Sequence, residues 1–263
     1  MEQNVKKKKN SGQTLYISWL LLLLALVSVT AATVAWFTIA DHTRLHSISM
    51  DVTSGPAIRF DLYAHDDIDR YKKTLTFDEI AAFLLAERGY DMRTKPLDPV
   101  TTQDCAEFTL RNGTVVSVDS GSYLEFTLHF IATQDVLVHL TSANSEGKAD
   151  GTLISSKTRE TLPAAMRISF TADNQTVVYD PGWDGGAGYS GAQRTFGLPD
   201  ANHMVYSDNT VLFSLQQEVD KPVVVRIWME GIDPACENSL QGADYSIRLR
   251  FEATDADYER VVS

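Results

Sequence analysis

Alternating apolar and polar residues dominate the chain after Asp41. In residues 46–53, for example, Ile48, Met50 and Val52 fall on one side of an extended chain, and polar residues fall on the other. This period of two is typical of a strand with one buried face. The pattern predicts about ten strands, at residues 46–53, 57–63, 115–118, 123–132, 136–141, 166–172, 176–179, 210–216, 223–230 and 245–253.

Residues 76–89 have the pattern of a helix instead. Thr76 is followed three residues later by Glu79, which is the signature of a capping box. Apolar residues then recur at helical spacing until Gly89, which is typical of a helix end. We expect a helix of about three turns that covers one open end of the packed strands.

Turn-forming pairs such as Asn112-Gly113 and Asp173-Asn174 separate the predicted strands. Many short strands with one inserted helix predict an all-β fold, a single antiparallel jelly-roll-like β-sandwich over residues 47–254 with a C-terminal tail at 255–263. Its core should contain the residues on the apolar phase of each strand: Ile48, Phe60, Phe126, Leu128, Ile168, Phe170, Ile227, Ile247, Leu249 and Phe251.

The beginning of the chain is a hydrophobic segment. Residues 15–40 are nearly all apolar, and no charged residue occurs between Lys9 and Asp41. Lysines before the segment and an acid after it follow the positive-inside rule, which keeps the N-terminus in the cytoplasm. A core helix of a soluble domain would need a polar face, which this segment lacks. We therefore expect an exported protein, either secreted or held at the cell surface.

Two interpretations of this leader remain. Residues 1–35 fit a signal peptide, with Thr33 and Ala35 as small residues before the cleaved bond and Trp36 after it. The apolar stretch is also long enough for a retained transmembrane helix. In both cases the membrane is a partner of the N-terminal helix before processing, and a signal peptidase is the partner for cleavage. Residues 36–46 then form a linker to the folded body.

Charge excludes one class of partner. The chain has 35 acidic and 23 basic side chains and a formal net charge of −12 at pH 7. The first 40 residues hold four lysines and one acid, so the acidic excess lies entirely in the body. An acidic body repels the phosphate backbone, so we expect no nucleic acid partner.

Signatures of common enzymes are absent. The chain has no Gly-x-Ser-x-Gly, P-loop, Gly-x-Gly-x-x-Gly or His-Glu-x-x-His motif. His42 and His46 have helical metal-site spacing but lie in a predicted linker and strand. The acids at 66–69, and Asp180 with Asp184, do not match the spacing of a calcium-binding loop. We expect no enzyme, no metal site and no cofactor.

Cysteine and histidine positions give two further hypotheses. Cys105 and Cys236 are the only cysteines, and a single disulfide between them is a candidate in an oxidising environment. The sequence does not fix the distance between them. If the strands that carry His129 and His139 form a hairpin, both side chains should face solvent.

Four segments, two towards each end of the chain, resemble a known family. Residues 33–38, Thr-Val-Ala-Trp-Phe-Thr, resemble the end of the leader in Gram-positive exported proteins handled by the SipW-type signal peptidase, which include the TasA and camelysin (CalY) family. Residues 47–53 and 242–254 resemble the first and final strands of that family, and residues 225–234 resemble a segment common in clostridial relatives. The resemblance implies a jelly-roll surface protein that assembles into biofilm-matrix fibres. Camelysin is described as a surface metalloprotease, but the missing His-Glu-x-x-His motif means that this activity does not carry over.

Two functions compete. The first is a structural or interaction protein that self-assembles through strand edges, with Trp36, Phe37 and Ile39 of the new N-terminus as an assembly strand. The second is a carbohydrate-binding module or hydrolase on the same scaffold, because a fold does not decide function. Its candidate residues surround the glycine-rich loop at 180–189, where an exposed aromatic row would support sugar binding: Trp183, Tyr189 and Phe196.

Overall fold

The computed structural model describes residues 16–28, 44–52, 57–143, 150–185, 193–237, 240 and 243–261. The chain divides into two compact units, Met1–Asp41 and His42–Ser263. In the first unit, residues 16–28 form a helix in which every side chain is exposed. Within the described ranges, no helix has both the length and the hydropathy needed to cross a membrane. The predicted cleavage site and most of the predicted linker lie outside the described residues.

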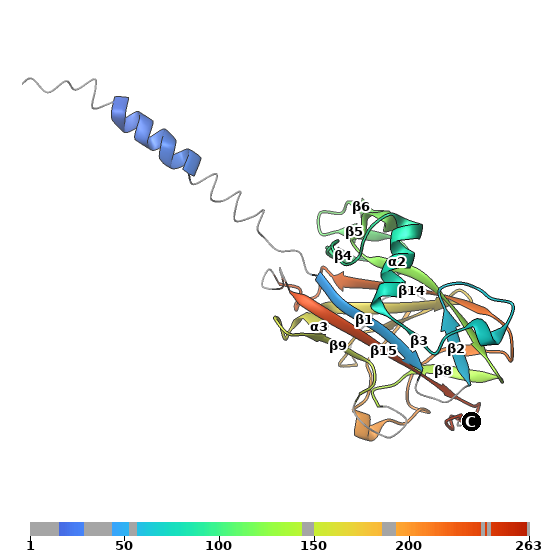
Figure 1. Ribbon diagram of the computed structural model, residues 1–263. Coiled ribbons are helices and arrows are strands. Elements are labelled where there is room, and N and C mark those ends of the chain that lie inside the picture. Colours follow the sequence, from blue (N-terminus) through green and yellow to red (C-terminus); the bar gives the residue numbers. More distant parts are fainter. Residues whose placement is uncertain are drawn as a thin grey trace, which may run out of the picture. The chain divides into compact units, whose positions relative to one another are not determined.

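The second unit is built on two β-sheets, as predicted for a sandwich (Figure 1). One sheet has six strands in the order β13-β8-β15-β1-β3, with β9 beside β15. The other has nine strands in the order β12-β11-β10-β14-β4-β5-β6, with β7 beside β14 and β2 beside β7. The described strands are β1 (Arg44–Val52), β2 (Ile58–Asp61), β3 (Thr74–Leu75), β4 (Pro99–Thr101), β5 (Phe108–Leu110), β6 (Val115–Val116), β7 (Leu124–Ala132), β8 (Val136–Leu140), β9 (Leu153–Ser156), β10 (Met166–Ala172), β11 (Gln175–Tyr179), β12 (Gln193–Phe196), β13 (Val211–Leu215), β14 (Lys221–Glu230) and β15 (Asp244–Thr254).

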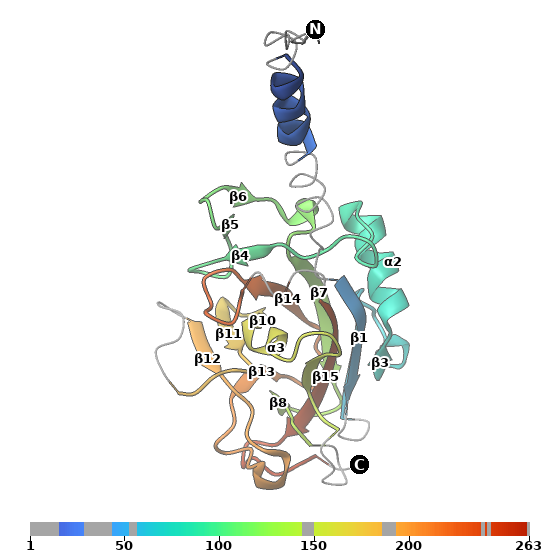
Figure 2. The ribbon, with the colours of Figure 1, turned by 90° about the vertical axis from the view of Figure 1, so that its left-hand side faces the viewer.

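The predicted helix is confirmed as α2 (Phe77–Arg88). Glu79 accepts a hydrogen bond from the Thr76 N–H at 2.8 Å, and Thr76 in turn accepts one from the Glu79 N–H at 3.4 Å, which completes the capping box. Gly89 ends the helix with a φ of 76°. The helix lies beside β1, and Arg88 bonds to Glu125 of β7 at 3.0 Å (Figure 2). The helix α2 thus covers the sandwich where β1 of one sheet and β7 of the other lie close to it.

Shorter helical segments complete the second unit. They are α3 (Leu162–Ala165) and three 3₁₀ turns, η1 (Ile68–Arg70), η2 (Val118–Ser120) and η3 (Ala201–His203). None of them was predicted, because three or four residues are too few to show a helical period.

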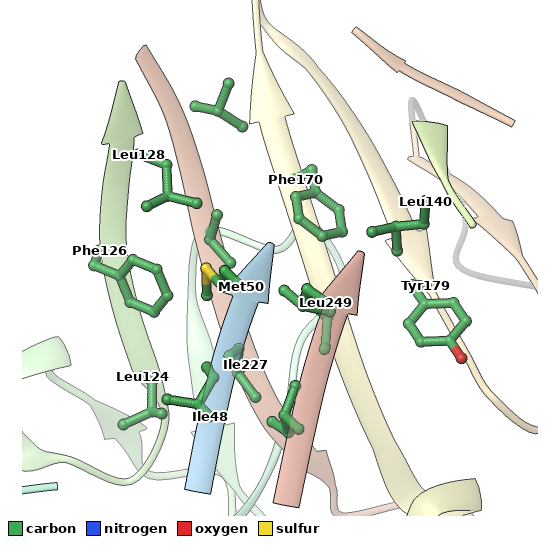
Figure 3. Packing of buried hydrophobic residues seen from close by; sticks show 14 of the residues in the cluster. Ile48, Met50, Leu124, Phe126, Leu128, Leu140, Phe170, Tyr179, Ile227 and Leu249 are labelled. Carbon is green, nitrogen blue, oxygen red and sulfur yellow. The ribbon is translucent and has the colours of Figure 1, made fainter. Parts of the chain in front are cut away.

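The core prediction is confirmed for all ten residues, each of which is at most 2% exposed. Their side chains point from both sheets into the space between them, as Figure 3 shows for Ile48, Phe126 and Leu249 among others. Phe251 lies among aromatic rings, with its centroid 5.2 Å from that of Phe130 and 5.7 Å from that of Phe60. The period of two therefore identified the inward face of these strands correctly.

The predicted strand direction is wrong for part of the fold, because the sheets are not purely antiparallel. β1 pairs in parallel with β15 along almost its whole length, from Arg44 opposite Asp244 to Val52 opposite Phe251. β11 with β12 and β14 with β4 are also parallel pairs. Side-chain alternation is the same for both directions, so it cannot distinguish them.

A second apolar cluster covers one end of the outer face of the nine-stranded sheet. Trp228 of β14 points away from the main core, because its neighbours Ile227 and Met229 point into it. The meander β4-β5-β6 brings Phe108 over this ring, at 5.3 Å between centroids, and Phe108 stacks on Tyr123 at 4.0 Å. The β4-β5-β6 meander therefore forms a third layer over the nine-stranded sheet at this end.

Domain boundaries need two corrections. β1 begins at Arg44, within the segment predicted as linker. The predicted C-terminal tail is not free in its described part, since the Val261 N–H bonds to the Ala253 carbonyl at 3.1 Å. The sequence pattern also missed β3, β4, β5, β9 and β12, which have two to four residues each. Strands this short do not establish an alternation.

Candidate functional site

The predicted cleavage and assembly segment lies outside the residues that the structure describes, as do His42 and Tyr189. The named residues of that segment are Thr33, Ala35, Trp36, Phe37 and Ile39. The structure instead shows the surfaces and polar clusters of the body to which such a segment is attached.

The disulfide prediction is wrong for this structure, in which Cys105 and Cys236 are both buried free thiols. Cys105 belongs to the outer cluster around Trp228, whereas Cys236 belongs to the main core between the sheets. The two thiols therefore lie in different apolar clusters. Burial raises the pKa of the Cys105 thiol to about 12 and also raises that of Cys236, so both remain protonated at neutral pH.

The strands that carry His129 and His139 do not form a hairpin with each other. β7 belongs to the nine-stranded sheet and β8 to the six-stranded one, because the chain changes sheets between residues 132 and 136. His129 is partly exposed and contacts Asp220 at 2.9 Å, while His139 is fully buried.

A sugar-binding aromatic row is not formed by the described part of the predicted set. Phe196 is 5% exposed and packs in the main core, where its ring lies 5.7 Å from that of Tyr179. Trp183 is half-buried. Phe196 is thus a core residue and cannot stack on a ligand, which weakens the carbohydrate-binding hypothesis.

The acidic residues singled out in the sequence have local structural roles. Asp67 accepts a hydrogen bond from the Asp69 N–H at the start of η1, and Asp69 pairs with Arg59 at 2.8 Å. Asp180 accepts from the Gly182 N–H at 2.8 Å and pairs with Arg167 at 3.0 Å. No group of three or more metal-ligating side chains occurs within the described ranges.

A buried ionic cluster around Arg167 escaped the sequence prediction. Arg167 of β10 is 6% exposed and contacts the carboxylates of both Asp180 and Asp233. It also donates to the carbonyl oxygen of Ala164 at 2.6 Å. Burial raises the pKa of Asp180, although Arg167 opposes this rise. The cluster joins three segments: β10, the start of the glycine-rich loop, and the loop after β14.

A second polar cluster links the segment after β2 to the turn before β14. The Tyr71 hydroxyl donates to Asp220 at 2.8 Å and accepts from the His65 N–H at 3.0 Å. The other oxygen of Asp220 lies 2.9 Å from Nδ1 of His129. His65 lies 3.3 Å from Asp61. These bonds hold loops together on the surface, and no sequence pattern indicates them because Tyr71 and Asp220 are far apart along the chain.

Free strand edges are the remaining candidate site. β13, an edge of the six-stranded sheet, shows a shift in register between Val211 and Phe213. Such irregularities protect an edge from pairing with another chain. β12 pairs with β11 without a shift, and no strand in the described part of the chain pairs with its other side. β12 is therefore a regular free edge of four residues, as is β9, which pairs with β15 without a shift.

No family model matches this chain, and neither the curated proteins nor the solved structures contain a match to it.

Proposed function

We propose that this chain is an exported surface protein of the TasA and camelysin type, a structural subunit that assembles through strand edges rather than an enzyme. The observation that carries the proposal is the regular free edge of β12 on a two-sheet body. The jelly-roll arrangement of that body, the biofilm-matrix fibre and the cell-surface location belong to the same proposal. They are supported by the leader and the terminal segments of the sequence.

The helix at residues 16–28 supports export. Its large apolar side chains are strongly exposed, with Trp19 at 68% and Leu22 at 63%. An apolar segment of this kind, preceded by lysines, is suited to the export machinery. Within the body, by contrast, the apolar side chains are mostly buried.

We predict that export removes residues 1–35, so N-terminal sequencing of secreted material should begin at Trp36. The small residues Thr33 and Ala35 before this bond fit a signal peptidase. A start several residues away would refute the site. Full-length protein in the membrane fraction would favour the anchor.

The new N-terminus supplies a suitable strand. Residues 36–40, Trp-Phe-Thr-Ile-Ala, are mostly apolar and long enough to pair with the four residues of β12. Burial of Trp36, Phe37 and Ile39 on a neighbouring subunit contributes on the order of 5 kcal/mol before ordering costs. Because this contact joins two different surfaces, it continues from subunit to subunit and forms filaments.

The test compares a chain that starts at Trp36 with one that starts at Arg44, by sedimentation and electron microscopy. A start at Ser47 would be less informative, because it removes the first three residues of β1. We expect filaments only from the longer chain. A third chain, with Trp36→Ser and Phe37→Ser, keeps the length and removes the apolar surface, and it should stay monomeric. Equal assembly by all three chains, or assembly by none, would contradict the proposal.

A further inference from the structure

His139 is a titratable side chain that the proposed assembly does not use. It is 0% exposed and lies on the outer face of β8, since its neighbours Val138 and Leu140 belong to the core between the sheets. Nδ1 lies 3.1 Å from the Thr210 carbonyl oxygen, and Nε2 lies 3.1 Å from the Thr254 hydroxyl. A carbonyl can only accept, so Nδ1 carries the hydrogen and Nε2 accepts from Thr254. The bonds therefore fit a neutral ring.

Two irregular segments cover this histidine. Residues 200–210 place the ring of Tyr206 5.4 Å from that of His139, and residues 255–261 place Tyr258 at 6.1 Å. The second segment turns back on β15, where the Val261 N–H donates to the Ala253 carbonyl at 3.1 Å, and within the segment the Asp255 N–H donates to the Glu259 carbonyl at 2.9 Å. Tyr258 has a φ of 64°, which is unfavourable for a side chain of its size. A cover of this kind opens more easily than the strands beneath it.

The charged groups near His139 belong to β15 and to the covering segment 255–261. Glu252 of β15 lies opposite His139 in the strand pairing and is 1% exposed. Arg260 of the cover lies 3.5 Å from Glu252, donates to the Tyr206 hydroxyl at 3.1 Å and lies over the Tyr206 ring. Burial lowers the pKa of His139 to about 4, although its hydrogen bond to the Thr210 carbonyl acts in the opposite direction.

We propose that residues 200–210 and 255–261 form an acid-operated clasp: uptake of one proton by His139 opens this cover while the two sheets stay folded. In the closed state an imidazolium at His139 would be fully buried, even with the Thr254 hydroxyl turned to accept from Nε2. In the open state the imidazolium is hydrated. Acid therefore shifts the population towards the open state, as any ligand that binds one state preferentially does.

The test is hydrogen exchange of the exported chain between pH 6.5 and pH 4, corrected for the intrinsic exchange rate. Opening of the cover should increase about 80-fold over this range, because the open histidine has an ordinary pKa of about 6.5 whereas that of the closed histidine is about 4. Amides of β7 and β14 should not change. His139→Gln should remove the pH dependence, and His203→Gln, on the exposed η3, should leave it as in the wild type.

Three results would overturn the clasp: a cover that stays closed at pH 4, equal acceleration in β7 and β14, or the same pH dependence in His139→Gln. If that variant does not fold, an NMR titration of the unmodified chain tests whether protonation of His139 and opening of the cover are coupled. The ring protons of His139 and the amides of residues 255–261 should then titrate together, and independent titrations would refute the coupling.

Discussion

Replacement of Arg167 by methionine should lower the free energy of unfolding by about 3–5 kcal/mol at pH 7. The change leaves the buried carboxylates of Asp180 and Asp233 without the cation that both contact. Methionine fills a similar volume, so the loss reports charge rather than packing. Denaturant unfolding of the chain from Trp36, at a concentration where it is monomeric, measures the effect.

The same variant should show a characteristic pH dependence. Burial already raises the pKa of Asp180 above its unfolded value of about 3.9, and without Arg167 this pKa rises further. The folded state then binds protons more tightly than the unfolded state, so stability falls as the pH rises through this interval. The loss of unfolding free energy that Arg167→Met causes should therefore become smaller as the pH is lowered from 7 towards 5. Arg93→Met breaks an exposed pair with Asp78 and should cost less than about 1 kcal/mol; an equal cost for both variants would contradict the account.

Phe251→Ala should also cost about 3–5 kcal/mol. The side chain is 0% exposed, and three other phenylalanine rings surround it within 6.0 Å between centroids, so its removal leaves a cavity. Leu153→Ala is the matched control: Leu153 lies on β9, which pairs with the same strand β15, and it is 49% exposed. The control should lose less than about 1 kcal/mol. A similarly small loss for Phe251→Ala would mean that the core is not packed as described.

Local chemistry made part of this fold predictable. The Thr76–Glu79 capping box and Gly89 define both ends of α2, because caps depend on residues adjacent in sequence. Alternation likewise identified core residues such as Ile48 and Phe251, because burial of one strand face imposes a period of two. Positive φ at Asp173 and Asn174 confirms the predicted tight turn between β10 and β11.

Long-range arrangement was not predictable in the same way. The parallel pairing of β1 with β15 joins the two ends of the body, and no local pattern encodes strand direction. Arg167 and His139 occupy the polar phase of their strands, which predicts exposure. Both are buried because distant segments cover those faces, with the loop after β14 over Arg167 and residues 200–210 and 255–261 over His139. Burial of a polar residue on an outer face becomes visible only in three dimensions.

The most direct test of assembly is a cross-link between the N-terminal strand of one subunit and β12 of another. Thr38→Cys and Arg194→Cys, placed on separate chains and mixed under mild oxidation, should give covalent dimers, and both changes on one chain should give a ladder of oligomers. The native thiols of Cys105 and Cys236 are buried and protonated, so they should not contribute. Val115→Cys, on the exposed β6, should give no cross-link with Thr38→Cys. Failure of the Thr38–Arg194 pair to cross-link, or equal yield with Val115→Cys, would contradict assembly at the β12 edge.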